Sequence, residues 1–435
     1  PTITPPCYLM ICLLDGTRFY AESCITYKPA LRNTPLLVTA GQGISIAANR
    51  ACTNIGISKF TPIWEEIDRL RVHKGIVYKA NFNTFSHHSD RFMTALEKHI
   101  QGARSMRYSV DEVFYDVSHL YQINVDLNEH VQALRKAIYK ETGVPTGAGV
   151  GKTLTLAKVA SWAAKNCQPY QGQCVLISEK ETDAVLKQMP VGKLWNIGRQ
   201  LNKHLTQEGI LTAYQLKQCD TKTYHKRYSI NVANVISELN GIACLDISVE
   251  REKKKQIWST ASYRDRLHHR DDLFAELAHH CAEVMRKIRD QKSEMKTLSV
   301  FVSTSKYDRC PPFYRRGELT LENGLTDTSF ALQQLRTLFD DLIPDNLAKQ
   351  PIYKVGVGAP SLIDAEVKQF ELFNRFDNKD TLNNALDQLS DRFGKGVIGF
   401  ACQQRSYHER QGEIEMLELE NYYTDIKDIV VVKCV

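Results

Sequence analysis

The feature that most constrains this chain is an apolar run near its start that ends at an acid. Residues 8–14 are apolar throughout, and Asp15 follows them directly. A strand without alternating polar positions is buried on both faces of a sheet. We therefore expect a covered sheet here, with a functional site at the edge where Asp15 stands.

Two further acids stand in a second strand-like segment, residues 106–117. Asp111 and Glu112 are adjacent there and have apolar neighbours on both sides. Because adjacent residues of a strand face opposite sides of the sheet, these acids fit a turn or a strand end better than a strand interior.

Helical patterns separate and follow these strands. Residues 44–55 are expected to be helical up to Gly56, and residues 85–101 and 153–165 have apolar positions at helical spacing. The last of these helices is expected to return to the domain of the first strand.

A different pattern begins at Pro190. A turn that ends at Gly198 precedes a helical stretch to Leu205, which is typical of a helix-hairpin-helix. The turn of that motif exposes main-chain N–H groups to nucleic-acid phosphates. Asn196 stands where the motif usually has its first glycine, and asparagine tolerates a positive φ. We expect Asn196 and Gly198 to contact DNA; a plain helical hairpin is the alternative.

Residues 255–358 have a regular order of elements. They read as strand, helix, strand, strand, helix and strand, which predicts a split ferredoxin-like βαββαβ domain. The first helix, at 272–294, has an inward apolar stripe that includes Cys281, so this cysteine is expected in the core.

The overall charge permits a polyanionic partner without requiring one. Lysine and arginine outnumber aspartate and glutamate by 56 to 50 in 435 residues, a net charge of +6. This length suggests about two to four domains. A basic run before the βαββαβ segment is expected to meet a DNA backbone, with solvation as the alternative. It consists of Lys253, Lys254 and Lys255.

The cysteines and histidines do not form metal-binding patterns. The 12 cysteines are scattered without a CxxC pair, which indicates a reducing compartment. The histidine pairs at 87–88, 268–269 and 279–280 are expected at the surface or at helix caps, because adjacent histidines diverge. No apolar run is long enough to span a bilayer and residues 1–6 do not begin a signal peptide, so we expect a cytoplasmic protein.

Three carboxylates at one sheet edge would suit phosphoryl transfer. Asp15, Asp111 and Glu112 offer the hard oxygen ligands that Mg²⁺ accepts. Two such ions about 4 Å apart activate an attacking 3′-oxygen and stabilise a leaving pyrophosphate. Spacing alone does not establish this site, because isolated acids are usually surface charges.

Three motifs strengthen that interpretation. Residues 15–21, Asp-Gly-Thr-Arg-Phe-Tyr-Ala, resemble the first motif of the Y family of DNA polymerases. Residues 108–112, Tyr-Ser-Val-Asp-Glu, resemble its second motif, and residues 155–160 with Lys165 resemble its third. The resemblance covers roughly residues 8–360 in the family's order, and the pattern is most similar to the UmuC-type catalytic subunits of bacterial DNA polymerase V.

The resemblance implies a fold and a division into domains. It implies a multidomain α+β right-hand polymerase with a ferredoxin-like palm, small fingers, a helical thumb and a βαββαβ little finger. The implied ranges are palm 1–22 and 85–172, fingers 23–84, thumb 173–248, little finger 249–360 and a C-terminal tail 361–435.

The resemblance also implies roles for single residues. The three acids would hold two Mg²⁺ ions, together with the main-chain carbonyl of Gly16. Tyr20 falls at the steric-gate position, where a ring excludes a 2′-hydroxyl, and a core aromatic is its alternative. Lys165 would contact the incoming triphosphate.

The fingers depart from the family pattern. Thr53 stands where a basic residue usually holds the β- and γ-phosphates. Arg50 lies one helical turn earlier on the same expected face and would substitute. Residues 40–43 read Ala-Gly-Gln-Gly, where the UmuC branch typically has Asn-Asn-Asp-Gly.

The tail contains a segment that resembles the pentapeptide with which proteins bind the bacterial sliding clamp. Gln369, Leu372 and Phe373 are its anchors, and two large apolar side chains suit a hydrophobic pocket. Packing on its own domain is the alternative. The implied partners are primer–template DNA, dNTPs, the sliding clamp, a UmuD-like subunit and a RecA filament.

The expected function is low-fidelity translesion DNA synthesis in the SOS response, without proofreading. A non-catalytic Y-family adaptor that binds DNA and the clamp is the main alternative. A nucleotide cyclase would share paired acids but not the hairpin or the clamp peptide. A P-loop ATPase is suggested by residues 147–153, although Thr146 stands where that loop requires glycine.

Overall fold

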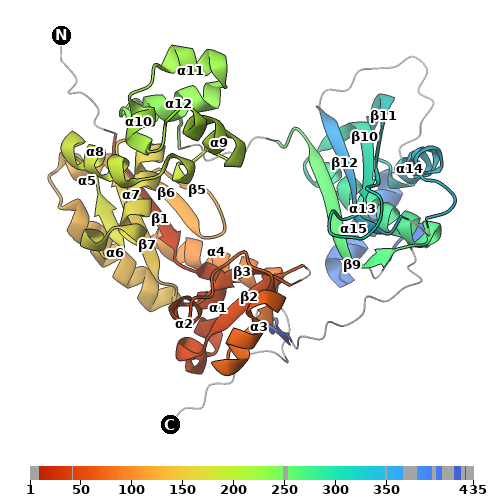
Figure 1. The fold of residues 1–435 in the computed structure, drawn as a ribbon, viewed down its shortest axis with the longest axis horizontal. Coiled ribbons are helices and arrows are strands. Elements are labelled where there is room, and N and C mark those ends of the chain that lie inside the picture. Colours follow the sequence, from red (N-terminus) through yellow and green to blue (C-terminus); the bar gives the residue numbers. More distant parts are fainter. Residues whose placement is uncertain are drawn as a thin grey trace. The chain divides into compact units, whose positions relative to one another are not determined.

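The computed structural model describes residues 9–41, 43–247, 253–347, 350–365, 380–393, 398–403, 416–422 and 427. The chain forms two compact units (Figure 1), one of Pro1–Arg251 with Ile414–Val435 and the other of Glu252–Glu413. Each unit contains apolar clusters of its own. No helix in the described ranges is both long and apolar enough to cross a membrane.

A five-stranded sheet of order β5-β6-β1-β7-β8 forms the centre of the first unit. Cys12 and Leu14 share an apolar cluster with residues of α4 and α6, whereas Ile11 and Leu13 share one with residues of α7. The apolar run is therefore buried on both faces, as predicted. The elements are β1 Ile11–Gly16, α4 Phe82–His99, β5 Ser105–Arg107, β6 Glu112–Asp116, α5 Ser118–Gln122, α6 Leu127–Thr142, β7 Thr146–Gly151, α7 Leu154–Asn166, η2 Gln168–Tyr170 and β8 Gln173–Val175.

A second sheet in this unit has the order β13-β4-β2-β3. The helix predicted at 44–55 is wrong in its first half, because residues 44–48 form β3 and pair antiparallel with β2. Pairing with a neighbouring strand overrides the weak helical preference of this stretch. The elements are α1 Phe19–Tyr27, η1 Pro29–Asn33, β2 Leu36–Ala40, β3 Ile44–Ala48, α2 Arg50–Asn54, α3 Ile63–Val72, β4 Ile76–Lys79 and β13 Leu417–Glu418.

Short helices follow the five-stranded sheet in sequence and share an apolar cluster with α7. The helical stretch predicted before Leu205 is present as α9. The elements are α8 Glu179–Gln188, η3 Val191–Lys193, α9 Arg199–Gln207, α10 Ala213–Lys217, α11 Thr221–Arg227 and α12 Ile230–Leu239.

The second unit contains a four-stranded antiparallel sheet of order β11-β10-β12-β9, with α13 and α14 on one face. The predicted βαββαβ order is confirmed, and Cys281 is fully buried in the core. The elements are β9 Ile257–Leu267, α13 Arg270–Asp290, β10 Ser293–Ser303, β11 Tyr314–Leu325, α14 Thr328–Leu342, β12 Ile352–Asp364, α15 Asp380–Phe393 and η4 Ala401–Gln403.

The glycines of residues 147–151 lie in strand β7 and not in a loop. A Cβ atom on Gly149 would stand 2.1 Å from the main-chain nitrogen of Ser161 on α7. These glycines therefore let the helix approach the strand closely. The P-loop alternative is wrong, because that motif needs its glycines in the turn between strand and helix.

Two histidines of the adjacent pairs are buried, which corrects the expectation of surface or capping positions. His88 is fully buried and His280 is 8% exposed. The Nδ1 atom of His88 lies 2.8 Å from the Tyr27 hydroxyl, and that of His280 lies 2.8 Å from the Ser259 hydroxyl. A hydrogen-bonding partner allows each imidazole to stay in the interior.

Candidate active site

Three carboxylates gather at one end of the five-stranded sheet. Asp15 on β1 is the cross-strand partner of Glu112, the first residue of β6. The amide of Gly16 donates to the carbonyl of Asp111 at 2.8 Å, which ties the turn before β6 to the end of β1. Asp111 lies in a turn and Glu112 at a strand end, as the sequence predicted.

Local hydrogen bonds hold the turn that carries Asp111. The amides of Tyr108 and Ser109 donate to the carbonyl of Glu112 at 2.9 and 3.2 Å. The Ser109 hydroxyl donates to Oδ1 of Asp111 at 2.7 Å. The main chain and one carboxylate oxygen of Asp111 are therefore fixed by neighbours in the sequence.

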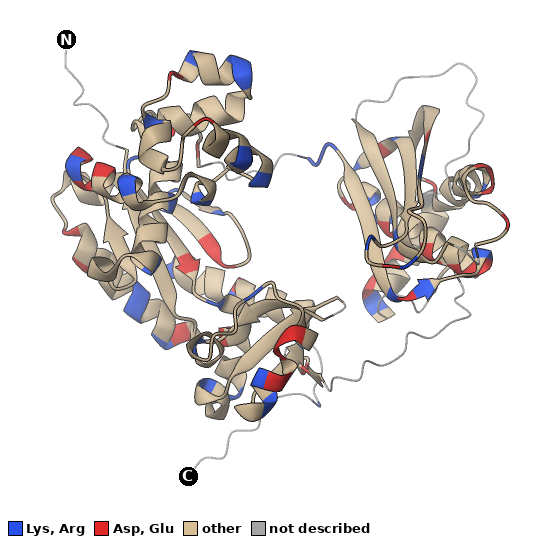
Figure 2. Cartoon of the chain, viewed as in Figure 1, with Lys and Arg blue, Asp and Glu red and all other residues tan. Residues whose placement is uncertain are grey.

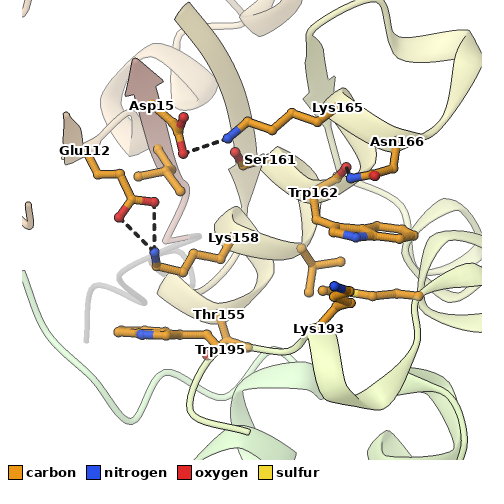
Figure 3. A pocket seen from close by; sticks show the side chains of 13 residues that line it. Asp15, Glu112, Thr155, Lys158, Ser161, Trp162, Lys165, Asn166, Lys193 and Trp195 are labelled. Carbon is orange, nitrogen blue, oxygen red and sulfur yellow. Dashed lines mark hydrogen bonds and ion pairs between the residues drawn. The ribbon is translucent and has the colours of Figure 1, made fainter. Parts of the chain in front are cut away.

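Two lysines of α7 pair with these acids (Figure 3). Lys165 Nζ lies 2.7 Å from Asp15 Oδ2, and Lys158 Nζ lies 3.0 Å from Glu112 Oε1. Residues seven positions apart lie on one face of a helix, since seven residues make about two turns. Sequence reasoning assigned no role to Lys158, although its spacing from Lys165 was a signal for one.

Burial is the main reason that the pKa values of Asp111 and Glu112 lie above their ordinary values. The negative charge of Asp15 raises both further. The Ser109 hydroxyl lowers the pKa of Asp111, and the Lys158 ammonium lowers that of Glu112, without reversing either shift. This end of the sheet thus holds more negative charge than its surroundings stabilise, which favours a bound cation.

The donor set fits a divalent cation. Three carboxylates supply hard oxygen ligands, and a cation would relieve the repulsion among them. Within the described ranges, no three His, Cys, Asp or Glu side chains are already arranged to hold a metal ion. Lys158 and Lys165 supply the neutralising charge in this conformation instead.

A cavity of about 260 Å³ opens beside Asp15 and Glu112 and is also lined by Lys158 and Trp195. The Trp195 indole donates to the Tyr108 hydroxyl at 2.9 Å. The Lys158 ammonium lies 5.4 Å from the Trp195 ring centre. The segment after η3 is therefore joined to the turn that carries the acids. Trp195 was not predicted, because a lone tryptophan in a sequence does not reveal a long-range contact.

Tyr20 lies near the start of α1, half-buried against Phe85 and Phe82, with ring centres 4.8 and 6.2 Å apart respectively. Burial raises the pKa of Tyr20, and the charge of Asp111 raises it further. Of the three acids, Asp111 is therefore the one whose charge acts on Tyr20. Arg50 begins α2 and is exposed, with no ion pair to any described residue.

The predicted hairpin turn has the backbone that its residues suggested. Asn196 has a φ of 66°, the left-handed conformation, and Gly198 is the N-cap of α9. Asn196, Gly198 and Arg199 are exposed. Figure 2 shows lysine and arginine on α9 in this part of the first unit.

The remaining predicted contact residues lie elsewhere. Lys253 of the second unit pairs with Asp364 at 2.8 Å, so its charge is already partnered. Lys254 and Lys255 are exposed. The clamp-binding segment with Gln369, Leu372 and Phe373 lies outside the described residues.

Comparison with known proteins gives one consistent family. The sequence profile of the impB/mucB/samB family matches residues 14–162, and the profile of that family's C-terminal domain matches residues 254–372. The protein UmuC of Salmonella typhimurium is 28% identical over 432 residues, covering 98% of this chain and 100% of the relative. DNA polymerase IV 2 of Halalkalibacterium halodurans is 24% identical over 394 residues, covering 89% of this chain and 93% of the relative.

A solved structure shares the fold. A Y-family DNA polymerase chimera superimposes with a TM-score of 0.61 at 16% identity, covering 82% of this chain and 99% of that one. The predicted α+β architecture of a right-hand polymerase is thereby confirmed.

Proposed function

Because this chain belongs to the impB/mucB/samB family, we propose that it is a Y-family DNA-directed DNA polymerase that performs translesion synthesis. Its relatives include the protein UmuC and a DNA polymerase IV. The observation that carries the proposal is the grouping of Asp15, Asp111 and Glu112 at one sheet end beside two lysines.

The reaction is nucleotidyl transfer from a dNTP to a primer. The primer 3′-hydroxyl loses its proton to solvent and its oxygen bonds to the α-phosphorus. The bond between that phosphorus and the oxygen that bridges to the β-phosphate breaks, and the β- and γ-phosphates leave together as pyrophosphate. Two Mg²⁺ ions, held by the three acids and the carbonyl of Gly16, would lower the pKa of the 3′-hydroxyl and neutralise the leaving group. Lys165 would exchange Asp15 for the triphosphate, because a phosphate oxygen is also a strong acceptor for an ammonium.

Two residues are proposed to select the incoming nucleotide. The Tyr20 ring would lie under the sugar and clash with a 2′-hydroxyl, which favours deoxynucleotides. Arg50 would contact the phosphates in place of Thr53, whose hydroxyl donates to the main-chain oxygen of Asn49 at 3.1 Å. An exposed guanidinium at the start of a helix suits a polyphosphate.

Several surfaces are proposed to hold DNA. The hairpin turn at Asn196 and Gly198 offers main-chain N–H groups, and Lys254 and Lys255 offer charge. The face of the second unit's sheet that α13 and α14 leave open carries three rings, from three strands. They are Trp258, Phe301 and Tyr314, with successive ring centres 6.1 and 6.5 Å apart.

The open face also has basic groups beside its rings. The Arg316 guanidinium lies 5.7 Å from the Trp258 ring centre, and the Lys354 ammonium lies 5.7 Å from that of Phe301. Rings next to cations are suited to nucleic acid, which offers both bases and phosphates. We propose that residues 249–360 are the little finger, with palm 1–22 and 85–172, fingers 23–84, thumb 173–248 and a C-terminal tail 361–435.

The biological setting is a finer part of the proposal. We propose low-fidelity bypass in the SOS response, in the cytoplasm, because the sequence motifs resemble those of the UmuC branch. We also propose action with the sliding clamp through Gln369, Leu372 and Phe373, and with a UmuD-like subunit and a RecA filament.

Primer extension tests the proposal. Wild type is mixed with primed template, dNTPs and Mg²⁺, alone and with clamp, RecA filament and a UmuD-like subunit, beside Asp111→Asn and the control Asp68→Asn. Asp68 has a side chain 93% exposed on α3, so its substitution leaves the palm unchanged. Extension by wild type and the control, but not by Asp111→Asn, supports the polymerase. If wild type fails in every mixture, the catalytic proposal is wrong and the adaptor becomes the better account.

A further inference from the structure

A short segment near the end of the chain, residues 416–422, packs on the part of its unit that carries strand β4. Its short strand β13 pairs in parallel with β4, with Leu417 opposite Tyr78 and Glu418 opposite Lys79. Leu419 is 3% exposed and belongs to the same apolar cluster as Phe85. The tail segment therefore completes the sheet β13-β4-β2-β3 and part of its core.

Hydrogen bonds to the main chain hold this tail segment in place. The Asn81 amide donates to the carbonyl of Leu419 at 2.8 Å, and the Thr84 hydroxyl donates to that of Glu420 at 2.8 Å. An extended segment that is bound through its main chain and an added strand is held as a peptide is in β-augmentation.

Side chains add to this docking. Lys28 Nζ lies 2.6 Å from Oε1 of Glu420. The Tyr422 ring stacks on the Tyr27 ring, with centres 4.3 Å apart. The Tyr422 hydroxyl donates to Oε2 of Glu420 at 2.7 Å, so both anchors support each other.

The elements that the tail segment contacts are those that hold Tyr20. Tyr27 and Lys28 lie at the end of α1, and Tyr20 lies near the start of that helix. Asn81 is the N-cap of α4, and the Phe85 ring of the same helix packs on Tyr20 at 4.8 Å. Because packed side chains transmit small displacements, loss of the tail segment would shift both supports of the Tyr20 ring.

We propose that residues 416–422 are a positioning segment of the nucleotide site, which holds α1 and α4 so that Tyr20 meets the sugar of the incoming nucleotide. The inference rests on the polymerase function proposed above. It assigns sugar selection in part to a segment that begins nearly 400 residues after Tyr20 in the sequence.

Substitutions in the full chain separate this role from simple stability. Leu419→Ala removes the buried anchor, and Leu417→Ala is the matched control, because Leu417 is 42% exposed in the same segment. Leu419→Ala is expected to raise KM for dNTPs about ten-fold and to lower discrimination against ribonucleotides, with kcat within about two-fold. Leu417→Ala should leave all three values unchanged. Unchanged KM and discrimination in folded Leu419→Ala would overturn the proposal.

Glu420→Gln serves as a second variant in case Leu419→Ala does not fold. It removes the charge that faces Lys28 without creating a cavity. It should raise KM for dNTPs, but by less than Leu419→Ala does. Equal discrimination by Glu420→Gln and wild type, with no added KM effect, would count against the tail segment.

Cleavage of the native protein tests the docking itself. A specific protease site is placed in residues 404–413 and cut, and the fragment that contains residues 416–422 is followed by size-exclusion chromatography. We expect the fragment to co-elute with the body of the protein, and free elution would overturn the proposal. If wild type extends no primer, the polymerase function fails while this docking result stands on its own.

Discussion

At the scale of single residues, the acids that are proposed to bind metal ions also lower the stability of the folded protein. Burial and the charge of Asp15 raise the pKa of Asp111, so the folded protein holds a proton on this carboxylate more readily than the unfolded chain does. The stabilisation that this neutral form gives is complete below the ordinary pKa of 3.8 and is lost as pH rises through the raised value. At neutral pH the site therefore strains the fold until a cation binds, a common trade between activity and stability.

We predict that Asp111→Asn raises the melting temperature at pH 7 in the absence of divalent ions, and lowers kcat by more than about a hundred-fold. Asparagine keeps the side-chain shape but carries no charge. Circular dichroism melting curves at pH 7 and at pH 3.5, beside Asp68→Asn, check this expectation. A variant that melts below wild type at pH 7 would contradict it.

His88 gives the opposite pH dependence. Burial lowers the pKa of His88 from 6.5 to about 4, with a smaller contribution from Arg91. Because the unfolded chain binds the proton more readily, the stability contribution is complete above pH 6.5 and is lost as pH falls through 4, a difference of about 3 kcal/mol. His88→Asn keeps an acceptor for Tyr27 and should reduce the change in the free energy of unfolding, measured with urea, between pH 6.5 and 4. His87→Asn, at the exposed neighbouring position, is the control and should show the same pH dependence as wild type.

At the scale of elements, the sequence predicted those with a strong periodic pattern. The helices of the βαββαβ segment were recognisable because their apolar positions repeat with one period, and the strand that leads to Asp15 was recognisable because it is apolar without interruption. Residues 44–48 were missed because whether such a short stretch forms a strand depends on its neighbour β2, not on its own pattern. The docking of residues 416–422 was equally invisible, since a two-residue strand carries no period.

Some residues of the candidate site were predictable from sequence motifs, and others were not. Motifs identified Asp15, Asp111, Glu112 and Lys165 as a set, although their roles remain predictions. Trp195 lies outside those motifs, and its bond to Tyr108 depends on how two distant loops meet.

Glycine in β7 is an element-scale requirement that can be tested. A Cβ atom on Gly149 would meet main-chain atoms of Ser161 and Ala157 at 2.1 and 2.4 Å, which a side-chain rotation cannot relieve. We predict that Gly149→Ala lowers the free energy of unfolding by about 3 kcal/mol. Gly198→Ala is the control, because a Cβ there has no neighbour within 4 Å. Urea denaturation compares the two, and equal midpoints would show that α7 and β7 are not packed as closely as described.

At the scale of the whole molecule, the two units have separate cores and should unfold separately. The large apolar cluster of the second unit draws all its buried members from Ile257–Ala359, whereas the carboxylates belong to the first unit. We predict two transitions in scanning calorimetry. Leu335→Ala, at a fully buried position of the second unit, should lower that unit's free energy of unfolding by about 2 to 5 kcal/mol. It should therefore lower the temperature of only one of the two transitions.

Mg²⁺ should act on the other transition alone. A ligand stabilises only the unit that binds it, by about 1.4 kcal/mol at ten times its Kd. We therefore expect Mg²⁺ to raise the temperature of the transition that Leu335→Ala leaves unchanged. Asp111→Asn should abolish that rise. A Mg²⁺ shift that persists in Asp111→Asn would place the cation away from the three acids. If Mg²⁺ instead raises the temperature of the transition that Leu335→Ala lowers, the cation binds the second unit. That result would contradict the proposed metal site at the three acids.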